Sequence, residues 1–163
     1  LLILDFLYPG GVFGEGALYE DGIYSYSAVA KEPARTWRIS WDDLQWLVSR
    51  DQLFALHLMR IVVAKLDQAY YKDRCIAGEK VEKRIACVLL KMVDEIGISD
   101  KCGLVIDTPL TNRDIAGLVG STEETVSRIM SRLKKEGIMG TEGKLLVVRD
   151  KKALLAYFDG IQA

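Results

Sequence analysis

Three polar residues near position 125 have the types and the spacing needed to read DNA bases. Glu124, Ser127 and Arg128 stand at i, i+3 and i+4, so a helix would bring them to one face, opposite Val126 and Ile129. Glutamate accepts from cytosine N4, arginine donates to both guanine O6 and N7, and serine bonds to several base edges. Because a recognition helix presents its N-terminal residues to the major groove, we predict that this face contacts bases.

Residues on both sides of this face suit further DNA contacts. Hydroxyl, amide and basic side chains bind phosphate oxygens, and such contacts set the register of a protein on the duplex. The further residues that we predict at the DNA surface are Thr111, Asn112, Ser121, Thr122, Glu123, Arg132 and Lys134.

A purely structural interpretation of the same residues stays open. Ser121 and Glu124 have the spacing of a capping box, in which the glutamate accepts from the serine amide. Glu124 and Arg128 also have the spacing of an i,i+4 ion pair, worth roughly 0.2–0.5 kcal/mol. If these residues serve only to stabilise the helix, the alternative function is a regulatory or scaffolding module. Its winged helix, a helix-turn-helix followed by a hairpin, would then contact protein. Salt-sensitive affinity for duplex DNA separates the two functions, because phosphate contacts release counterions.

Glycines and capping residues delimit the helices that would carry these side chains. Thr111 is expected to begin a helix, with Asp114 completing an imperfect capping box, and Gly120 is expected to end it. Ser121 then begins the second helix, which Gly137 ends. The segments IMG and LLVVR around TEGK predict a two-stranded hairpin, and LVID predicts a short strand before the first helix. Two helices joined at a glycine turn and followed by a hairpin make a winged helix-turn-helix.

Short apolar runs in residues 1–40 predict strands. The runs LLILDFL, VFGEGALY, YSYSAVA and ARTWRIS are separated by PGG, EDG and KEP, whose residues favour turns. We predict only part of an antiparallel β sandwich or roll, because four strands alone would leave a sheet edge uncovered. The chain begins with Leu1 in mid-pattern, so we expect further sequence upstream.

Helices are expected from residue 41 onward. Residues 41–50 predict a short helix with Ser40 as N-cap. A long helix follows and is broken at Gly78, and a third helix runs from Val81 to near Gly97. The long helix carries a heptad seam of Leu56, Met59, Val63, Leu66 and Tyr70, beside a second apolar stripe of Phe54, Leu58, Ile61 and Val62. We predict homodimerisation through the seam, with packing of both stripes inside one chain as the alternative.

The composition fits a globular protein without a catalytic site. The chain has 163 residues, 50% of them hydrophobic, and lacks an apolar run long enough to span a membrane. Residues 1–50 carry four basic and seven acidic side chains, whereas residues 111–163 carry nine basic and seven acidic, so DNA contact belongs in the last third. The sequence has no Ser/His/Asp set, P-loop or complete Rossmann fingerprint, which argues against an enzyme. Three cysteines without a CxxC pair predict a cytoplasmic protein without a metal site.

The segment LTNRDIAGLVGSTEETVSRIMSRLKKEGIM, residues 110–139, resembles the helix-turn-helix of the CRP/FNR transcription regulators over its full length. The resemblance extends over nearly the whole chain and implies an α+β fold class: a partial antiparallel β roll of the cyclic-nucleotide-binding type, a long dimerisation helix and a C-terminal winged helix-turn-helix. It places an effector-sensing β-roll domain at residues 1–50, the dimerisation helix at 51–77 and the DNA-binding domain at 78–163. The implied protein is an effector-responsive homodimer that binds double-stranded DNA and has RNA polymerase as a further partner.

The pattern Glu124-x-x-Ser127-Arg128 is similar to that of the FNR branch of this family, where E-x-x-S-R reads TTGAT-type half-sites. The resemblance therefore implies a TTGA-containing palindrome, with one half-site for each subunit.

The sensor segment departs from the family pattern. Gly14 and Glu15 resemble the family's phosphate-binding cassette, but Tyr24 and Ser25 stand where cyclic-nucleotide binders have Arg-Ser or Arg-Thr. A buried cyclic phosphate would lack its counter-charge, which argues against cyclic AMP as the effector. These four residues are the predicted effector site, with a turn kept for its shape as the structural alternative.

The resemblance leaves the identity of the effector open. An iron–sulfur cluster of the FNR kind is not expected, because Trp37 stands where a ligating cysteine would fall. Haem or another small molecule stays open as the effector. His57, on the long helix, is expected to be a packing or surface residue.

Overall fold

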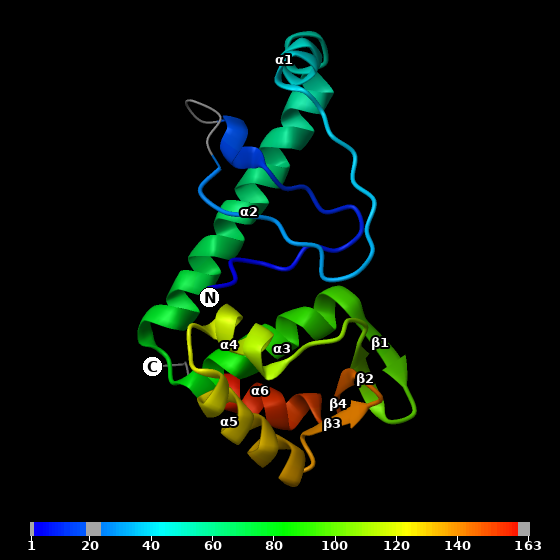
Figure 1. The fold of residues 1–163 in the computed structure, drawn as a ribbon. Coiled ribbons are helices and arrows are strands. Elements are labelled where there is room, and N and C mark those ends of the chain that lie inside the picture. The colour runs from blue at the N-terminus through cyan, green and yellow to red at the C-terminus, as the bar shows by residue number, and fades with distance from the viewer. Residues whose placement is uncertain (1, 19–23, 160–163) are drawn as a thin grey trace. The chain divides into compact units, whose positions relative to one another are not determined.

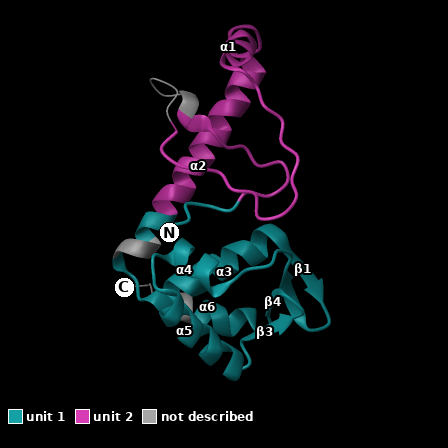
Figure 2. Cartoon of the chain, viewed as in Figure 1, with its two compact units in different colours: residues 1–6, 72–163 teal, residues 7–71 magenta. Residues whose placement is uncertain are grey.

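A computed structural model describes residues 2–18 and 24–159, apart from the side chains of residues 17, 18, 75–77 and 157–159. The chain divides into two compact units, one of residues 1–6 and 72–163 and the other of residues 7–71 (Figure 2). The elements in chain order (Figure 1) are the 3-10 helix η1 (Glu15–Leu18), α1 (Trp41–Arg50), α2 (Gln52–Gly78), α3 (Val81–Ile96), β1 (Gly97–Asp100), β2 (Gly103–Ile106), α4 (Asn112–Val119), α5 (Glu123–Lys135), β3 (Met139–Glu142), β4 (Leu145–Val148) and α6 (Lys151–Asp159).

The three helices predicted between residue 41 and Gly97 are all present, as α1, α2 and α3. α1 begins at its predicted N-cap Ser40, whose Oγ accepts from the Asp43 amide at 3.1 Å. α2 begins after Asp51, whose carboxylate accepts from the amides of Leu53 and Phe54 at 2.9 and 3.0 Å. These acceptors satisfy N–H groups that have no partner inside a helix. α2 ends at Gly78, which confirms the predicted break.

The strands predicted in residues 1–40 are not formed within the described ranges 2–18 and 24–40. The regular element there is η1, which lies inside the run VFGEGALY. An apolar alternation favours a strand, but a strand exists only where a second backbone pairs with its N–H and C=O groups. Those ranges contain no such pairing, so the predicted runs are irregular segments.

The C-terminal part of the chain contains a four-stranded antiparallel sheet in the order β1-β2-β4-β3. β3 and β4 are the predicted hairpin, paired from Met139↔Val148 to Glu142↔Leu145. β2 is the predicted strand at LVID, and its pairing with β4 and β1 extends the hairpin to four strands. Neither β1 nor α6 is among the predicted elements. β1 has the sequence GISD and is mostly exposed, so its residues lack the apolar alternation that marks a strand.

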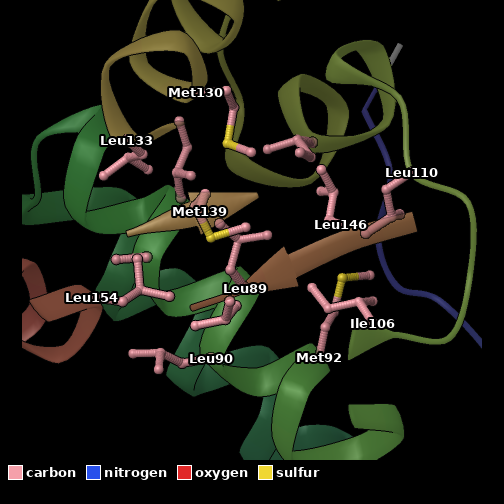
Figure 3. Close-up of a cluster of buried hydrophobic side chains, with 14 of the residues drawn as sticks. Leu89, Leu90, Met92, Ile106, Leu110, Met130, Leu133, Met139, Leu146 and Leu154 are labelled. Carbon is pink, nitrogen blue, oxygen red and sulfur yellow. The ribbon is translucent and has the colours of Figure 1, made fainter. Parts of the chain in front are cut away.

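The hydrophobic core of the unit containing residues 72–163 holds α4 and α5 in place. α3 packs against α4, α6 and β2, and α5 packs against α4 and β3. Leu89 of α3, Leu133 of α5 and Leu154 of α6 are almost completely buried, and Figure 3 shows their side chains gathered around Met139. Burial of each such side chain contributes about 1.5–3 kcal/mol. The apolar faces of α4 and α5 are therefore fixed inward, which directs their polar faces to solvent.

Candidate nucleic-acid interface

α4 has the boundaries and the capping that its sequence predicts. The Thr111 hydroxyl accepts from the Asp114 amide at 3.1 Å, and the Asp114 carboxylate accepts from the Thr111 amide at 2.8 Å. This reciprocal pair is a complete capping box. Gly120 ends the helix with φ +62°, and its amide donates to the Ala116 carbonyl. A left-handed residue at this point turns the chain sharply into α5, and glycine adopts that conformation without steric cost.

α5 begins one residue later than predicted. Its N-cap is Thr122, whose hydroxyl accepts from the Thr125 amide at 3.2 Å. Ser121 still belongs to the turn, because its amide donates to the Ala116 carbonyl at 3.0 Å. The predicted capping box of Ser121 and Glu124 is therefore wrong, since the side chain of Ser121 cannot begin a helix that starts after Thr122. The Glu124 carboxylate is left without a capping role.

The face of α5 predicted to read bases lies on the surface. Glu124 and Arg128 are exposed and Ser127 is half-buried, whereas Val126 and Ile129 on the opposite face are 0% and 3% exposed. Among the residues that the structure describes, Glu124 and Arg128 form no ion pair with each other, so the alternative of an i,i+4 pair is wrong here. The structure thus brings an acceptor, a hydroxyl and a forked donor together on one solvent-facing surface.

The charges along α5 run from acidic to basic. Glu123 and Glu124 lie in its first turn, and Arg132, Lys134 and Lys135 lie in its last turn. Each group lies at the helix end whose partial charge it complements, which stabilises the helix. The two carboxylates also repel phosphates, so a duplex that approaches this end must offer base N–H donors to them.

The residues predicted to bind phosphate differ in their exposure and in the hydrogen bonds or ion pairs that their side chains already form. Thr111 is exposed but its hydroxyl donates to the Asp114 carboxylate at 2.6 Å, and Asn112 is half-buried. Arg132 forms ion pairs with Glu82 of α3 at 3.6 Å and with Glu136 at 3.9 Å. The contact with Glu82 is not among the predicted contacts. No local pattern signals it, because the two residues are 50 positions apart and only the packing of α5 on α3 brings them together.

The predicted effector residues surround an internal ion pair. The Glu15 carboxylate lies 2.8 Å from the Lys65 ammonium of α2, and the Gly14 amide donates to the Tyr26 hydroxyl at 3.3 Å. Burial has the largest single effect and would raise the pKa of Glu15, but the hydrogen bonds to Lys65, to a backbone amide and to Tyr26, together with the charge of Lys65, outweigh it and lower the pKa. Glu15 Oε2 is buried without a hydrogen-bond partner among the described residues. Lys65 and Tyr26 are absent from the predicted site, because nothing local in the sequence links them to Gly14 and Glu15.

The other two predicted effector residues are more open. Tyr24 is 56% exposed, and its ring lies 3.4 Å from the position that a Cβ on Gly14 would occupy. Ser25 is exposed. The structure therefore brings three of the four predicted residues, Gly14, Glu15 and Tyr24, to one place, with Lys65 as an unforeseen cation beside them.

The seam of α2 is exposed along its length. Leu56, Met59, Val63, Leu66 and Tyr70 are 46–58% exposed in the isolated chain. In the second apolar stripe Phe54 and Leu58 are half-buried, so it is better covered than the seam. His57 is exposed, as expected for a surface residue. Within the described ranges no helix is both long and apolar enough to cross a membrane.

Two family models match the chain. The model of the Crp-like helix-turn-helix domain matches residues 83–157, and the model of the cyclic nucleotide-binding domain matches residues 2–51. The first match covers α4, α5 and the sheet. The second supports the predicted fold class for the N-terminal segment, in which the described residues carry no strand ladder.

Known proteins are similar to this chain over most of its length. The chain is 30% identical to the cyclic AMP receptor protein of Thermus thermophilus, over 93% of this chain and 67% of that protein. It is 30% identical to the cAMP-activated global transcriptional regulator CRP of Pasteurella multocida, over 90% of this chain and 70% of that protein. The structure of FixK2 from Bradyrhizobium japonicum aligns with a TM-score of 0.65 at 26% identity, over 71% of this chain and 57% of FixK2.

A CooA mutant from Carboxydothermus hydrogenoformans aligns with a TM-score of 0.66 at 21% identity, over 72% of this chain and 54% of CooA. The chain thus spans about two thirds of the length of these curated relatives and little more than half of these solved structures. The observed order of long helix, helix-turn-helix and wing agrees with the family match. The chain belongs to the CRP/FNR family of helix-turn-helix transcriptional regulators, which are not enzymes.

Proposed function

We propose that this protein is an effector-responsive, sequence-specific DNA-binding regulator that acts as a homodimer on a palindromic, TTGA-type site. The exposed face of α5 carries the proposal. Glu124 and Arg128 lie one turn apart on it, both exposed and not paired with each other. An exposed carboxylate and an exposed guanidinium supply the acceptor and the forked donor that base edges require.

The sign of the charges at the start of α5 favours contact with bases over contact with the backbone. Glu123 and Glu124 would be repelled by phosphate, whereas a carboxylate facing cytosine N4 gains a hydrogen bond. Arg128 is placed to read a guanine in the same half-site. Phosphate contacts are assigned to residues around this face, namely Thr111, Asn112, Ser121, Thr122 and Arg132. To bind phosphate, Arg132 must break its ion pairs with Glu82 and Glu136. Exposed ion pairs of this kind are worth only about 0–1 kcal/mol.

The homodimer is supported by the exposed seam of α2. Five apolar side chains at heptad spacing remain 46–58% exposed in one chain. Pairing two copies of α2 along this seam would remove them from water and would place one α5 on each half of a palindrome. In this arrangement residues 1–50 are the sensor domain, residues 51–77 the dimerisation helix and residues 78–163 the DNA-binding domain, with RNA polymerase as a further partner.

The effector region is assigned to Gly14, Glu15, Tyr24 and Ser25. The relatives named above include proteins described as cAMP-activated, but here Glu15 pairs with Lys65 and no arginine follows the cassette. We therefore infer an effector other than cyclic AMP. Haem and other small molecules remain the alternatives to compare in binding assays.

Gel shifts with a TTGA palindrome and a scrambled duplex of equal length and composition test the proposal. The unchanged protein should prefer the palindrome by about a thousandfold or more. Arg128→Ala and Glu124→Ala should each lower the affinity for the palindrome by about tenfold to a hundredfold, because each removes one base contact. Lys152→Ala, an exposed change on α6, is the control and should leave it unaltered.

Two outcomes would contradict the proposal. Binding that ignores the duplex sequence, or that survives both substitutions on α5, would remove the base-reading role. Affinity for duplex DNA that is weak and insensitive to salt would instead favour a module that contacts protein.

A further inference from the structure

Arg84, in the first turn of α3, donates to two backbone carbonyls that belong to different parts of the fold. Its Nε donates to the Glu79 carbonyl at 2.8 Å, and its Nη1 donates to the Val119 carbonyl at 3.3 Å. The side chain is half-buried. A guanidinium is a rigid planar fork with five N–H donors, so one arginine can hold two acceptors in a fixed relation to each other.

The first acceptor lies in the short linker between α2 and α3. The Glu79 carboxylate also pairs with the Lys83 ammonium at 3.1 Å, and the Lys80 carbonyl accepts from the amides of Lys83 and Arg84 at 3.0 and 3.2 Å. Glu79 and Lys80 are therefore fastened to the first turn of α3. A displacement of α2 reaches α3 through this linker, because the chain continues from one helix to the other.

The second acceptor lies at the turn of the helix-turn-helix. Val119 is the last residue of α4, and its carbonyl is one of the four that lack a partner inside the helix. The C-terminal end of a helix carries a partial negative charge, which the guanidinium complements. The next residue, Gly120, has left-handed backbone geometry and directs the chain into α5. A contact at Val119 therefore acts on the point from which α5 is oriented.

We propose that Arg84 is a positioning residue for DNA recognition, which joins the linker after α2 to the turn that orients α5. When the linker moves, the Glu79 carbonyl moves relative to α3, and the guanidinium has to shift or release the Val119 carbonyl. The orientation of α5 thereby depends on the state of α2. This inference rests on the proposed function, because its effect is read in DNA recognition.

Two substitutions in the full chain test the role. Arg84→Met keeps the apolar stem and removes the fork, whereas Arg84→Lys keeps the charge with a single donor group. Arg84→Met should lower the affinity for the TTGA palindrome by about tenfold while the affinity for a scrambled duplex is unchanged. Arg84→Lys should restore part of the loss. Lys101→Met, in the exposed turn between β1 and β2, removes the same charge and should leave both affinities unaltered.

Hydrogen exchange supplies a readout that does not need DNA. The amides of Gly120 and Ser121 donate to the Ala116 carbonyl, and those of Lys83 and Arg84 donate to the Lys80 carbonyl. Arg84→Met should accelerate exchange at both pairs together, at an unchanged melting temperature. Should Arg84→Met lower the melting temperature, Arg84→Lys is used for the same comparison.

The outcomes separate the inference from the proposed function. If the unchanged protein does not discriminate the palindrome, the proposed function fails and hydrogen exchange alone decides the role of Arg84. Faster hydrogen exchange at only one of the two amide pairs in Arg84→Met would overturn the inference. An unchanged ratio of palindrome to scrambled affinity in a protein that does discriminate also overturns it.

Discussion

Thr122 holds the amino end of α5 with its hydroxyl and so decides which neighbouring side chains are available. Because Thr122 caps the helix through the Thr125 amide, the Glu124 carboxylate is not used for capping and stays exposed. Had Ser121 been the cap, Glu124 would have been directed back to the serine amide. A shift of one residue in the helix start therefore decides whether the face of α5 that we propose to read bases contains an exposed acceptor.

The cap assignment predicts different costs for two adjacent hydroxyls. Thr122→Val removes the acceptor without changing the shape of the side chain and should lower the free energy of unfolding by about 1 kcal/mol. Ser121→Ala is the matched control and should cost less than about 0.5 kcal/mol. Urea unfolding followed by circular dichroism measures both. A larger loss for Ser121→Ala than for Thr122→Val would show that the cap lies one residue earlier.

The Glu15–Lys65 pair makes the stability of its unit depend on acid pH. The pKa of Glu15 is lowered below its ordinary value of 4.5: burial, the largest single effect, raises it, but the hydrogen bonds and the charge of Lys65, with smaller hydrogen-bond contributions, together outweigh burial. A carboxyl with a lowered pKa in the folded state stabilises above its unfolded pKa and loses that contribution as pH falls through the folded value. The pair is partly exposed, so the contribution should be below about 1 kcal/mol.

Glu15→Gln should therefore reduce the fall in melting temperature between about pH 6 and about pH 3 relative to the unchanged protein. Lys65→Met should give a similar reduction, because it removes the other half of the pair. Thermal melts at matched ionic strength provide the comparison. Equal pH slopes in all three proteins would exclude the pair as a source of acid sensitivity.

At the scale of elements, the turn between α4 and α5 depends on one glycine. Gly120 has φ +62°, a region in which an L residue with a Cβ costs roughly 1–2 kcal/mol. No heavy atom lies within 4 Å of the position of an added Cβ, so the cost of a substitution is conformational and not steric. The turn sets the direction of α5, so strain here should affect both stability and DNA recognition.

Gly120→Ala should lower the free energy of unfolding by about 1–2 kcal/mol. Gly78→Ala is a suitable control, because Gly78 has neither a positive φ nor an atom within 4 Å of its added Cβ. That change should be neutral or stabilising by about 0.4–1 kcal/mol. Chemical denaturation of both variants measures the difference. Equal effects at the two glycines would argue that the left-handed turn contributes nothing.

At the scale of the whole molecule, the exposed seam of α2 predicts the oligomeric state. Each apolar side chain of the seam would contribute about 1.5–3 kcal/mol on full burial, which favours association of two copies. Met59 and Val63 are 57% and 55% exposed in the single chain. Replacing both with glutamate would place charges in the proposed interface, where burial without partners is costly.

The double variant Met59→Glu with Val63→Glu should therefore sediment as a monomer, with helical content unchanged. Gln68→Glu adds a charge on another face of α2 and should leave a dimer. Analytical ultracentrifugation at micromolar concentration gives the masses, and circular dichroism checks folding. A monomeric unchanged protein, or a dimeric double variant, would rule out the seam as the interface.

The local features of this chain could be read from its sequence. The capping pair Thr111 and Asp114, the glycine at 120 and the hairpin around TEGK act over a few residues, and the structure confirms each of them. Helical spacing likewise placed Glu124 and Arg128 on one face opposite Val126. Such features follow from backbone geometry and from contacts within one or two turns, so they do not depend on the rest of the fold.

Tertiary structure alone decided the contacts between distant residues. The pairs Glu82–Arg132 and Glu15–Lys65, the bond from Arg84 to the Val119 carbonyl, and the pairing of β2 with β4 all join segments far apart in the chain. The strands predicted in residues 1–40 are absent from the described ranges for the same reason, since strand formation needs a pairing backbone as well as an apolar pattern. Spacing along the sequence determines which side chains share one face of a helix, whereas packing of the core determines which distant residues that face contacts.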